Sequence, residues 1–308
     1  MTSILNTVDT SHEDLIHDAA LDYYGLKLAT CSSDRSVKIF DAQKNQKTLI
    51  EDLRKHEGPV WQVSWAHPMF GNYLASCSYD KKVIVWKEMS SNKWTPFYIY
   101  QGHESSVNTV SWAPCEFGLV FACGSSDGCI SIVSLSGDGN WIARKIDNAH
   151  PTGCTSLNWA PAFPSDDQNE SVFSAKRIVS GGCDNIVKIW REDQSGQWVL
   201  DQNLQGHTDW VRDVAWSQNI IHNKTNIASC SQSGKVIIWS CDLSDTTNGA
   251  LSIWKSKVLH EFNTVAWHVS WSLTSNMLAV STGDNKVTIW KEDHLGKYEC
   301  INDDKLGN

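Results

Sequence analysis

Apolar residues in this chain alternate with polar ones as they do in β-strands, and the alternation itself recurs along the chain. In the clearest copies, apolar residues stand four, seven and nine positions after a histidine, and the ninth position holds a tryptophan. The seventh and ninth positions lie on one face of a strand. The six copies of this block begin at His12, His56, His103, His150, His207 and Phe262.

A second block follows each copy of the first and predicts two strands joined by a tight turn. It contains small residues, a turn, and then alternating β-branched residues that end in an aromatic residue, as in CSYDKKVIVW and STGDNKVTIW. Successive turns lie about 50 residues apart, which is close to the length of one four-stranded blade. Insertions at 161–171, 218–225 and 242–249 account for the extra length and are predicted to be exposed loops. The turn positions are Asp34, Asp80, Asp127, Asp184, Ser233 and Asp284.

This period predicts an all-β fold, a WD-repeat β-propeller with six blades. The repeats start near 12, 56, 103, 150, 207 and 262, and together they use the whole chain, so a single domain over 1–308 is expected.

Counting strands leaves one strand too many for a closed propeller of six blades. The last repeat has its own fourth strand at 296–302, yet the N-terminal segment 1–10 also contains a strand-like stretch at 3–8. Either this stretch joins the last blade and closes the ring, or the first and last blades keep open edges that a partner fills with a seventh blade. The second alternative is favoured. The predicted acceptor-edge residues are Ile4, Leu5, Val8, Val287, Ile289 and Trp290.

Histidine, serine, aspartate and tryptophan recur at fixed positions within the repeats. A single set could be taken for a nucleophilic triad, but a catalytic constellation normally occurs once per site. A chain of hydrogen bonds that ties the outer part of a blade to its inner turn suits every copy, so catalysis is not expected. The two fullest sets are His56, Ser76, Asp80 and Trp86, and His150, Ser180, Asp184 and Trp190.

Charge and cysteine usage exclude several other functions. The net charge of −9, without a local cluster of Lys or Arg, argues against direct binding of nucleic acid. The sequence shows neither a signal peptide nor a membrane-spanning run, so a soluble cytoplasmic protein is expected. The ten cysteines include no Cys-x-x-Cys pair and are predicted to be reduced, and no metal or other cofactor is expected.

Three tryptophans, Trp61, Trp210 and Trp267, lie outside the repeated core positions. Tryptophan and arginine are enriched at binding hot spots, which suggests a contact surface formed by Asp209, Trp210 and Arg212. The alternative is that these tryptophans pack against a neighbouring blade.

Several segments resemble one family closely, among them His12–Phe40, His56–Trp86 with the stretch WAHPMFGN, and HTDWVRDV from His207. This is the family of small propeller subunits shared by the outer coat of coat protein complex II (COPII) vesicles and the Y-shaped scaffold complex of the nuclear pore. The resemblance implies an open propeller that receives its seventh blade from a partner. It implies two partners: the large WD-repeat and α-solenoid subunit of the coat, and an α-solenoid nucleoporin.

The resemblance further implies a location at endoplasmic reticulum exit sites, on COPII vesicles and at the nuclear pore, with membrane association only through the coat. A link to a vacuolar or lysosomal nutrient-signalling complex also belongs to this family. Two other functions stay open as alternatives: a self-closed propeller that binds peptides as an adaptor, and the sister propeller of the nuclear-pore and nutrient-signalling complexes.

Overall fold

The structure is a computed structural model, and it describes residues 7–43, 48–90, 92–162, 176–218, 224–242, 253–293 and 296–302. The chain divides into two compact units, one within Ile4–Cys154 and the other within Thr155–Asn308. Each unit is built from the same element, a four-stranded antiparallel sheet.

The first unit contains three sheets, and each consists of strands that are consecutive in the chain. The first sheet contains β1 (Ile16–Leu21), β2 (Lys27–Ser32), β3 (Val37–Asp41) and β4 (Thr48–Leu53). The second contains β5 (Val60–Trp65), β6 (Tyr73–Ser78), β7 (Val83–Ser90) and β8 (Lys93–Tyr100), with the 3-10 turn η1 (Pro68–Phe70). The third contains β9 (Val107–Trp112), β10 (Val120–Ser125), β11 (Ile130–Leu135) and β12 (Trp141–Ile146), with η2 (Cys115–Phe117).

The second unit repeats this plan in three further sheets. Its first sheet contains β13 (Cys154–Trp159), β14 (Arg177–Gly182), β15 (Ile186–Glu192) and β16 (Trp198–Gln205). The next contains β17 (Val211–Trp216), β18 (Lys224–Ser231), β19 (Lys235–Asp242) and β20 (Trp254–Glu261). The last contains β21 (Ala266–Trp271), β22 (Met277–Thr282), β23 (Val287–Glu292) and β24 (Tyr298–Cys300).

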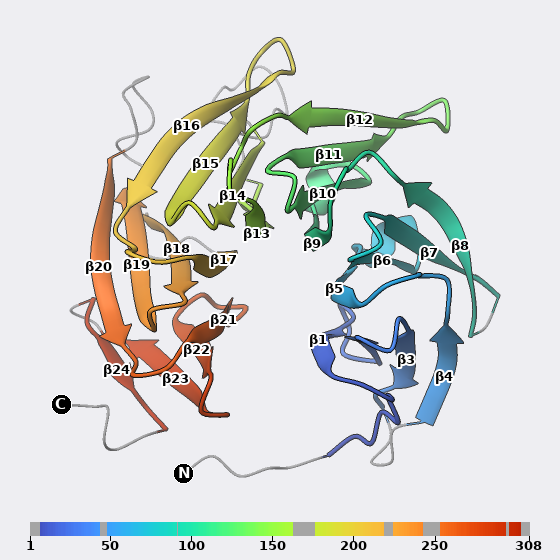
Figure 1. The fold of residues 1–308 in the computed structure, drawn as a ribbon, viewed down its shortest axis with the longest axis horizontal. Helices are drawn as coiled ribbons and strands as arrows, with labels where there is room; N and C mark the ends of the chain where they lie inside the picture. Colours follow the sequence, from blue (N-terminus) through green and yellow to red (C-terminus); the bar gives the residue numbers. More distant parts are fainter. Residues whose placement is uncertain are drawn as a thin grey trace. The chain divides into compact units, whose positions relative to one another are not determined.

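The predicted all-β architecture of six four-stranded blades is confirmed, and among the described strands none is shared between the first blade and the last. Figure 1 shows β1, β5 and β9 side by side within the first unit, with their sheets fanning outwards to β4, β8 and β12. In the second unit β17 and β21 lie side by side in the same way. That the chain forms a single domain stays a prediction.

Two local predictions differ from the structure. Lys224 and Thr225 are predicted to lie in a loop but begin β18, because their backbone pairs with Asp242 and Cys241 of β19. The described part of the predicted N-terminal strand, residues 7 and 8, adopts no strand conformation. The remainder of that predicted strand lies outside the described residues.

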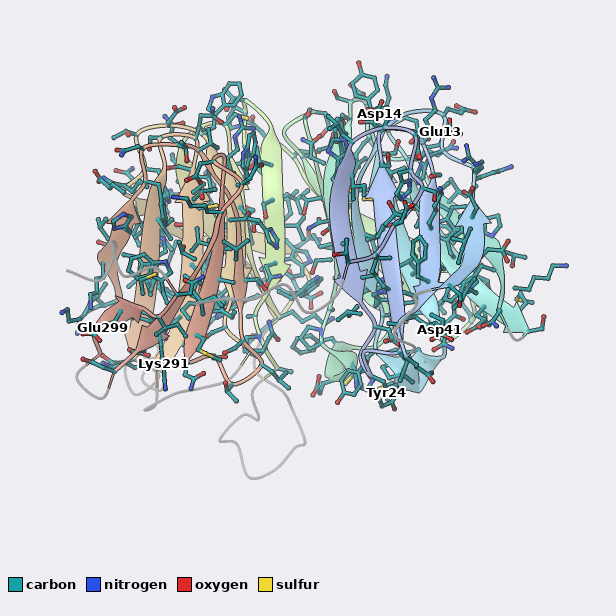
Figure 2. All side chains as sticks on the ribbon, turned by 90° about the horizontal axis from the view of Figure 1, so that it is seen from below. Glu13, Asp14, Tyr24, Asp41, Lys291 and Glu299 are labelled. Atoms are coloured by element: carbon teal, nitrogen blue, oxygen red, sulfur yellow. The ribbon has the colours of Figure 1, made fainter. Side chains whose placement is uncertain are left out.

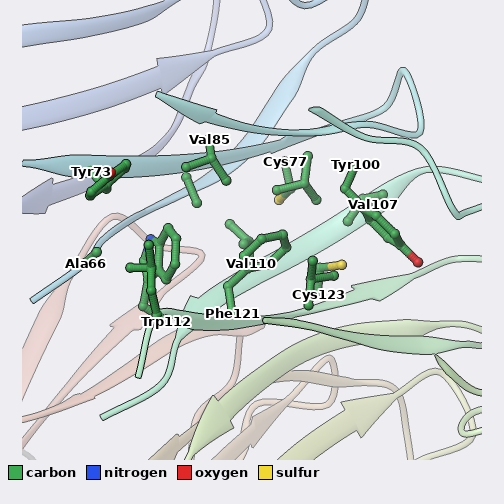
Figure 3. Packing of buried hydrophobic residues seen from close by; sticks show 14 residues of the cluster. Ala66, Tyr73, Cys77, Val85, Tyr100, Val107, Val110, Trp112, Phe121 and Cys123 are labelled. Carbon is green, nitrogen blue, oxygen red and sulfur yellow. The ribbon is translucent and has the colours of Figure 1, made fainter. Parts of the chain in front are cut away.

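The core consists of apolar side chains packed between consecutive blades. Figure 3 shows one such cluster, in which Tyr73 and Val85 of the second blade face Val107, Val110 and Phe121 of the third. The ten cysteines, all of them described residues, form no disulfide with one another, and six of them are buried, where they pack as small apolar side chains. The core clusters of each unit therefore join consecutive blades.

Candidate functional site

Each blade has two packing faces. The forward face carries alternating apolar residues of the third strand, such as Val37 and Ile39 in the first blade, and packs on the following blade. The rear face carries apolar residues of the innermost strand, such as Val60 and Val63 in the second blade, and packs on the preceding blade. These four side chains are buried, and each contributes about 1.5–3 kcal/mol through burial of apolar surface.

The forward face of the last blade is exposed. Val287 and Ile289 of β23 occupy the positions of Val83 and Val85 in β7, which are fully buried. Val287 is 57% exposed, and Ile289 is half-buried. An exposed apolar face at a position that is buried in other blades is a candidate contact surface.

Trp290 is predicted to belong to this edge, but it lies on the other side of β23. It is 3% exposed and packs in a core cluster with Val236 and Ile238 of the fifth blade. Successive residues of a strand point to opposite faces, so Trp290 belongs to the packed side of the blade. Trp290 therefore does not belong to the exposed edge, contrary to the prediction.

The rear face of the first blade is also exposed. Ile16 is 47% exposed and Leu21 58% exposed, and Ala19 between them is exposed as well. The corresponding Val60 and Val63 of the second blade are buried. Figure 2 shows this blade with Glu13 and Asp14 at one end and Tyr24 and Asp41 at the other.

The sequence pattern does not single out these rear-face residues, although one signal is present. Leu21 occupies a position that holds tryptophan in each of the other five repeats. Of the N-terminal residues predicted to act at this edge, Val8 is half-buried and lies in no strand. Ile4 and Leu5 lie outside the described residues.

The polar set of the second blade forms a continuous chain of hydrogen bonds. Trp86 Nε1 donates to Ser76 Oγ at 2.9 Å, and Ser76 Oγ lies 2.8 Å from His56 Nε2. His56 Nδ1 lies 2.9 Å from the Asp80 carboxylate. Because a carboxylate can only accept, His56 Nδ1–H donates to Asp80, and the Ser76 hydroxyl links the indole to the imidazole. Ser76 is fully buried, so this chain cannot reach a substrate and links parts of one blade.

The corresponding residues of the fourth repeat lie in similar surroundings. Trp190 Nε1 donates to Ser180 Oγ at 2.9 Å, and the Asp184 carboxylate accepts from Lys188 Nζ at 2.9 Å. His150 is fully buried. The tryptophan–serine hydrogen bond therefore occurs in this blade as well.

Four of the turn aspartates, Asp34, Asp80, Asp127 and Asp284, have lowered pKa values. Burial alone would raise the pKa of Asp127, but the backbone N–H groups of Glu104 and Cys129 and the ring of His103 together lower it to about 2. Burial would likewise raise the pKa of Asp80, but the hydrogen bond and the charge of His56 outweigh this effect and lower it. A carboxylate with a lowered pKa stabilises the fold above its unfolded pKa, and this contribution is lost as the pH falls through its folded pKa.

The fifth blade lacks this aspartate, which leaves a buried histidine nitrogen without a partner. His207 Nε2 lies 2.7 Å from Ser229 Oγ, which also accepts from Trp239 Nε1 at 2.8 Å. Among the described residues, His207 Nδ1 has no hydrogen-bond partner. Ser233 stands at the turn position that holds aspartate in the other five blades.

We expect Ser233→Asp to stabilise the chain by about 1–2 kcal/mol at pH 7, because the new carboxylate accepts from His207 Nδ1–H. Urea unfolding of the two proteins measures the difference. Ser233→Asn, which is similar in size but uncharged, is the matched control and should give a smaller gain. A stability of Ser233→Asp at or below that of Ser233→Asn would contradict the expectation.

The same histidine should make the stability sensitive to mild acid. Burial, followed by the charge of Lys235, lowers the pKa of His207 to about 4, against an ordinary value of 6.5. Between these two values the unfolded chain binds a proton that the folded chain does not, so stability falls as the pH drops from 6.5 to 4, by about 3 kcal/mol. Unfolding at pH 7 and pH 4.5 measures this loss. Ser233→Asp should reduce the loss, and an equal loss in both proteins would exclude His207 as its cause.

The tryptophans outside the repeated core differ in their surroundings. Trp61 donates through Nε1 to Ser106 Oγ of the next blade at 2.9 Å, so it packs between blades. Trp210 and Trp267 are 47% and 49% exposed, and the Arg212 guanidinium lies between them, 5.3 Å and 4.9 Å from their ring centroids. Arg212 Nε donates to Gln232 Oε1 at 2.6 Å, which orients the guanidinium.

Asp209 lies at the border of this cluster, where its carboxylate accepts from the Trp210 N–H at 2.7 Å. The described parts of the chain contain no group of three or more His, Cys, Asp or Glu side chains that could hold a metal ion. Of the helices described in the structure, none is long and apolar enough to cross a membrane.

The repeats match a known family. Residues 3–41, 47–87, 94–134, 144–191 and 198–240 each match the WD domain, G-beta repeat family. These segments include strands of each of the first five blades, and the sixth blade has the same four-stranded topology. The chain is thus a WD-repeat protein with six blades.

Its relatives specify the family further, and the chain belongs to the SEC13 family. It is 55% identical to the human protein SEC13 homolog over 311 aligned positions, which cover 100% of this chain and 95% of the relative. It is 54% identical to the Drosophila melanogaster protein SEC13 homolog, covering 98% of this chain and 84% of that one. It is 56% identical to the Schizosaccharomyces pombe protein transport protein sec13, covering 97% and 99%.

Proposed function

We propose that the chain is a structural scaffold of the COPII outer coat, which forms vesicles at the endoplasmic reticulum, and of the Y-shaped complex of the nuclear pore. It acts by accepting a blade from an α-solenoid partner. The observation that carries the proposal is the exposure of Val287. The same position is fully buried in the second blade, where it holds Val83, and in the fourth blade, where it holds Val187. Membership of a family that includes a protein transport protein supports the transport role.

In this proposal the donated blade packs on the forward face of the last blade and on the rear face of the first. Its apolar residues cover Val287 and Ile289 on one side, and Ile16 and Leu21 on the other. Because burial of apolar surface holds the joint, the partner's solenoid leaves the propeller in one fixed direction and the lattice edge resists bending. The segment that includes Ile4, Leu5 and Val8 contributes one strand to the completed blade.

The partners in this proposal are the large WD-repeat and α-solenoid subunit in the coat, and an α-solenoid nucleoporin in the pore. The protein is cytoplasmic and reaches endoplasmic reticulum exit sites, COPII vesicles and the nuclear pore through these partners. A nutrient-signalling complex at the vacuole or lysosome offers a third use of the same edges. No direct contact with nucleic acid or lipid is required.

Size-exclusion chromatography of the chain alone, and after co-expression with the blade-donating segment of the large coat subunit, tests the proposal. A stoichiometric complex is expected. A chain that stays monomeric and does not bind the segment would indicate the self-closed peptide-binding adaptor instead. Deletion of 1–8 tests the N-terminal strand separately, because undiminished binding by the truncated chain would exclude its role.

A second contact surface is supported by the cluster of Trp210, Arg212 and Trp267. Two half-exposed indoles that hold a guanidinium between them resemble the aromatic and arginine anchors of binding hot spots. We expect the double variant Trp210→Ala/Trp267→Ala to keep its affinity for the donated blade and to lose contacts in the assembled coat, with assembly weakened by about tenfold. Light scattering of cage assembly measures this, with Trp210→Phe/Trp267→Phe as the control. Normal assembly by the alanine variant would exclude the surface.

A further inference from the structure

A cation of the second unit lies between two half-exposed indoles. Arg212 belongs to β17, Trp210 immediately precedes this strand, and Trp267 belongs to β21. Figure 1 shows β17 and β21 side by side. The Arg212 guanidinium lies 5.3 Å from the ring centroid of Trp210 and 4.9 Å from that of Trp267, close enough for each ring to attract the charge. Together these three side chains form a Trp–Arg cluster.

The guanidinium of this cluster is held from one side. Gln232 Oε1 accepts from Arg212 Nε at 2.6 Å, and the main-chain N–H of Gln232 donates to the Trp210 carbonyl at 2.8 Å. Within the described ranges, Arg212 forms no ion pair, and neither of its Nη groups donates to another residue. A guanidinium fixed through Nε presents its two Nη groups as a planar fork, which matches the two oxygens of a carboxylate.

The charge of Arg212 is not neutralised by its neighbours. Asp213 follows it directly, but the Asp213 carboxylate is buried and bonded to the adjoining blades. The charge acts as far as the fourth blade: burial raises the pKa of the Cys183 thiol, and Arg212 acts in the opposite direction. The cluster therefore keeps a positive charge at the surface of a chain whose net charge is −9.

The second indole is open, although its repeat position is closed in another blade. Trp61 and Trp267 both stand five positions after the start of their repeats. Trp61 is half-buried and donates through Nε1 to Ser106 Oγ, whereas Trp267 Nε1 donates to none of the residues that the structure describes. Gly283 leaves this nitrogen accessible, since even a Cβ added there would lie 3.5 Å from it. Trp267 thus offers a partner both an apolar ring and an N–H donor.

We propose that the Trp–Arg cluster binds an aspartate or glutamate side chain in a linear segment of a partner protein. The carboxylate accepts from both Nη groups of Arg212, and an apolar residue next to it in the segment packs on the exposed indoles. This inference rests on the second contact surface of the proposed function and specifies what that surface binds. A carboxylate fits better than a phosphate group, because the cluster has one cation and Asp209 lies at its border, so a dianion would be only partly compensated.

Selection from a phage-displayed library of random linear peptides on the full chain tests this chemistry. The peptides that Arg212→Gln no longer captures should share an aspartate or glutamate beside an apolar residue. Arg54→Gln is the matched control, since it removes the same charge from the first blade, where Arg54 pairs with Asp52. This control should capture the same peptides as the unmodified chain. Absence of any acidic peptide whose capture depends on Arg212 would overturn the inference.

A double-mutant cycle separates direct contact from an effect on the fold. Fluorescence anisotropy measures the affinity of a selected peptide, and of the same peptide with its acidic residue replaced by the amide, for the unmodified chain and for Arg212→Gln. Each single change should weaken binding about tenfold, and both together should weaken it little more than either alone. Losses that simply add would overturn the inference. Arg212→Lys keeps the charge without the planar fork and should bind with intermediate affinity.

A peptide with phosphoserine in place of the acidic residue distinguishes a phosphate group from a carboxylate. It should bind no more tightly than the acidic peptide, and tighter binding would overturn the assignment to a carboxylate. Arg212→Gln should unfold at the temperature of the unmodified chain and still co-elute with the blade-donating segment. Normal coat assembly by this variant would contradict the use of the surface in the coat, whereas the peptide measurements alone decide whether the cluster binds a carboxylate.

Discussion

Replacement of Val287 by glutamate is expected to leave the chain folded and to weaken its binding of a donated blade by more than about a hundredfold. The side chain is 57% exposed in the free chain, so the carboxylate stays hydrated there. In a completed junction the position becomes buried, as Val83 is in the second blade. The carboxylate would then lose its water without gaining a partner, and the cost appears only on binding.

Val258→Glu is the matched control for this variant. Val258 is 49% exposed and belongs to β20, the fourth strand of the fifth blade, away from both packing faces. Both variants should unfold at the temperature of the unmodified chain, while only Val287→Glu should fail in isothermal titration and in co-elution with the blade-donating segment. If both variants bind the segment like the unmodified chain, the forward face of the last blade is not the acceptor.

The blades could be predicted from the sequence because their core positions recur with one spacing and one residue class. His56 and Trp86, for example, stand at recurring positions of the repeat, and they lie in one hydrogen-bond chain. The exposed edge is harder to predict. Val287 and Ile289 stand two residues apart and lie on one face of the strand, whereas Trp290 follows Ile289 directly and points to the other face. The alternation of a strand is enough to indicate this difference.

In other hydrogen bonds, a side chain in the innermost strand of one blade accepts from a main-chain N–H in the innermost strand of the next blade. These bonds could not be predicted in the same way. Their acceptors are Asp18, Gln62, Ser156 and Asp213, which share only the ability to accept a hydrogen bond. A search for a repeated residue type passes over such a position. The exposed rear face of the first blade escapes prediction for a related reason, since Ile16 and Leu21 are ordinary core residues in sequence. Their exposure depends on which blade precedes them and not on their own identity.

Replacement of Asp213 by alanine is expected to cost about 2–4 kcal/mol of folding stability. The Asp213 carboxylate is buried and joins three blades of the second unit. It accepts from Ser156 Oγ at 2.5 Å on one oxygen, and from Val269 N at 2.9 Å and His268 Nδ1 at 2.5 Å on the other. Alanine would leave the Val269 N–H and the Ser156 hydroxyl buried without this acceptor, whereas His268 is half-exposed and can turn to water.

Urea unfolding of Asp213→Ala, with Asp209→Ala as the control for loss of a nearby carboxylate, measures this cost. Asp213→Asn keeps one acceptor oxygen and should fall between Asp213→Ala and the unmodified chain. A loss below about 0.5 kcal/mol for Asp213→Ala would show that apolar packing alone holds the junction. Because Val269 belongs to the innermost strand of the last blade, a loosened junction should also weaken binding of the donated blade, while Val287 itself remains unchanged. Such a coupled loss would mean that the edge binds its partner only when the blade behind it is held in place.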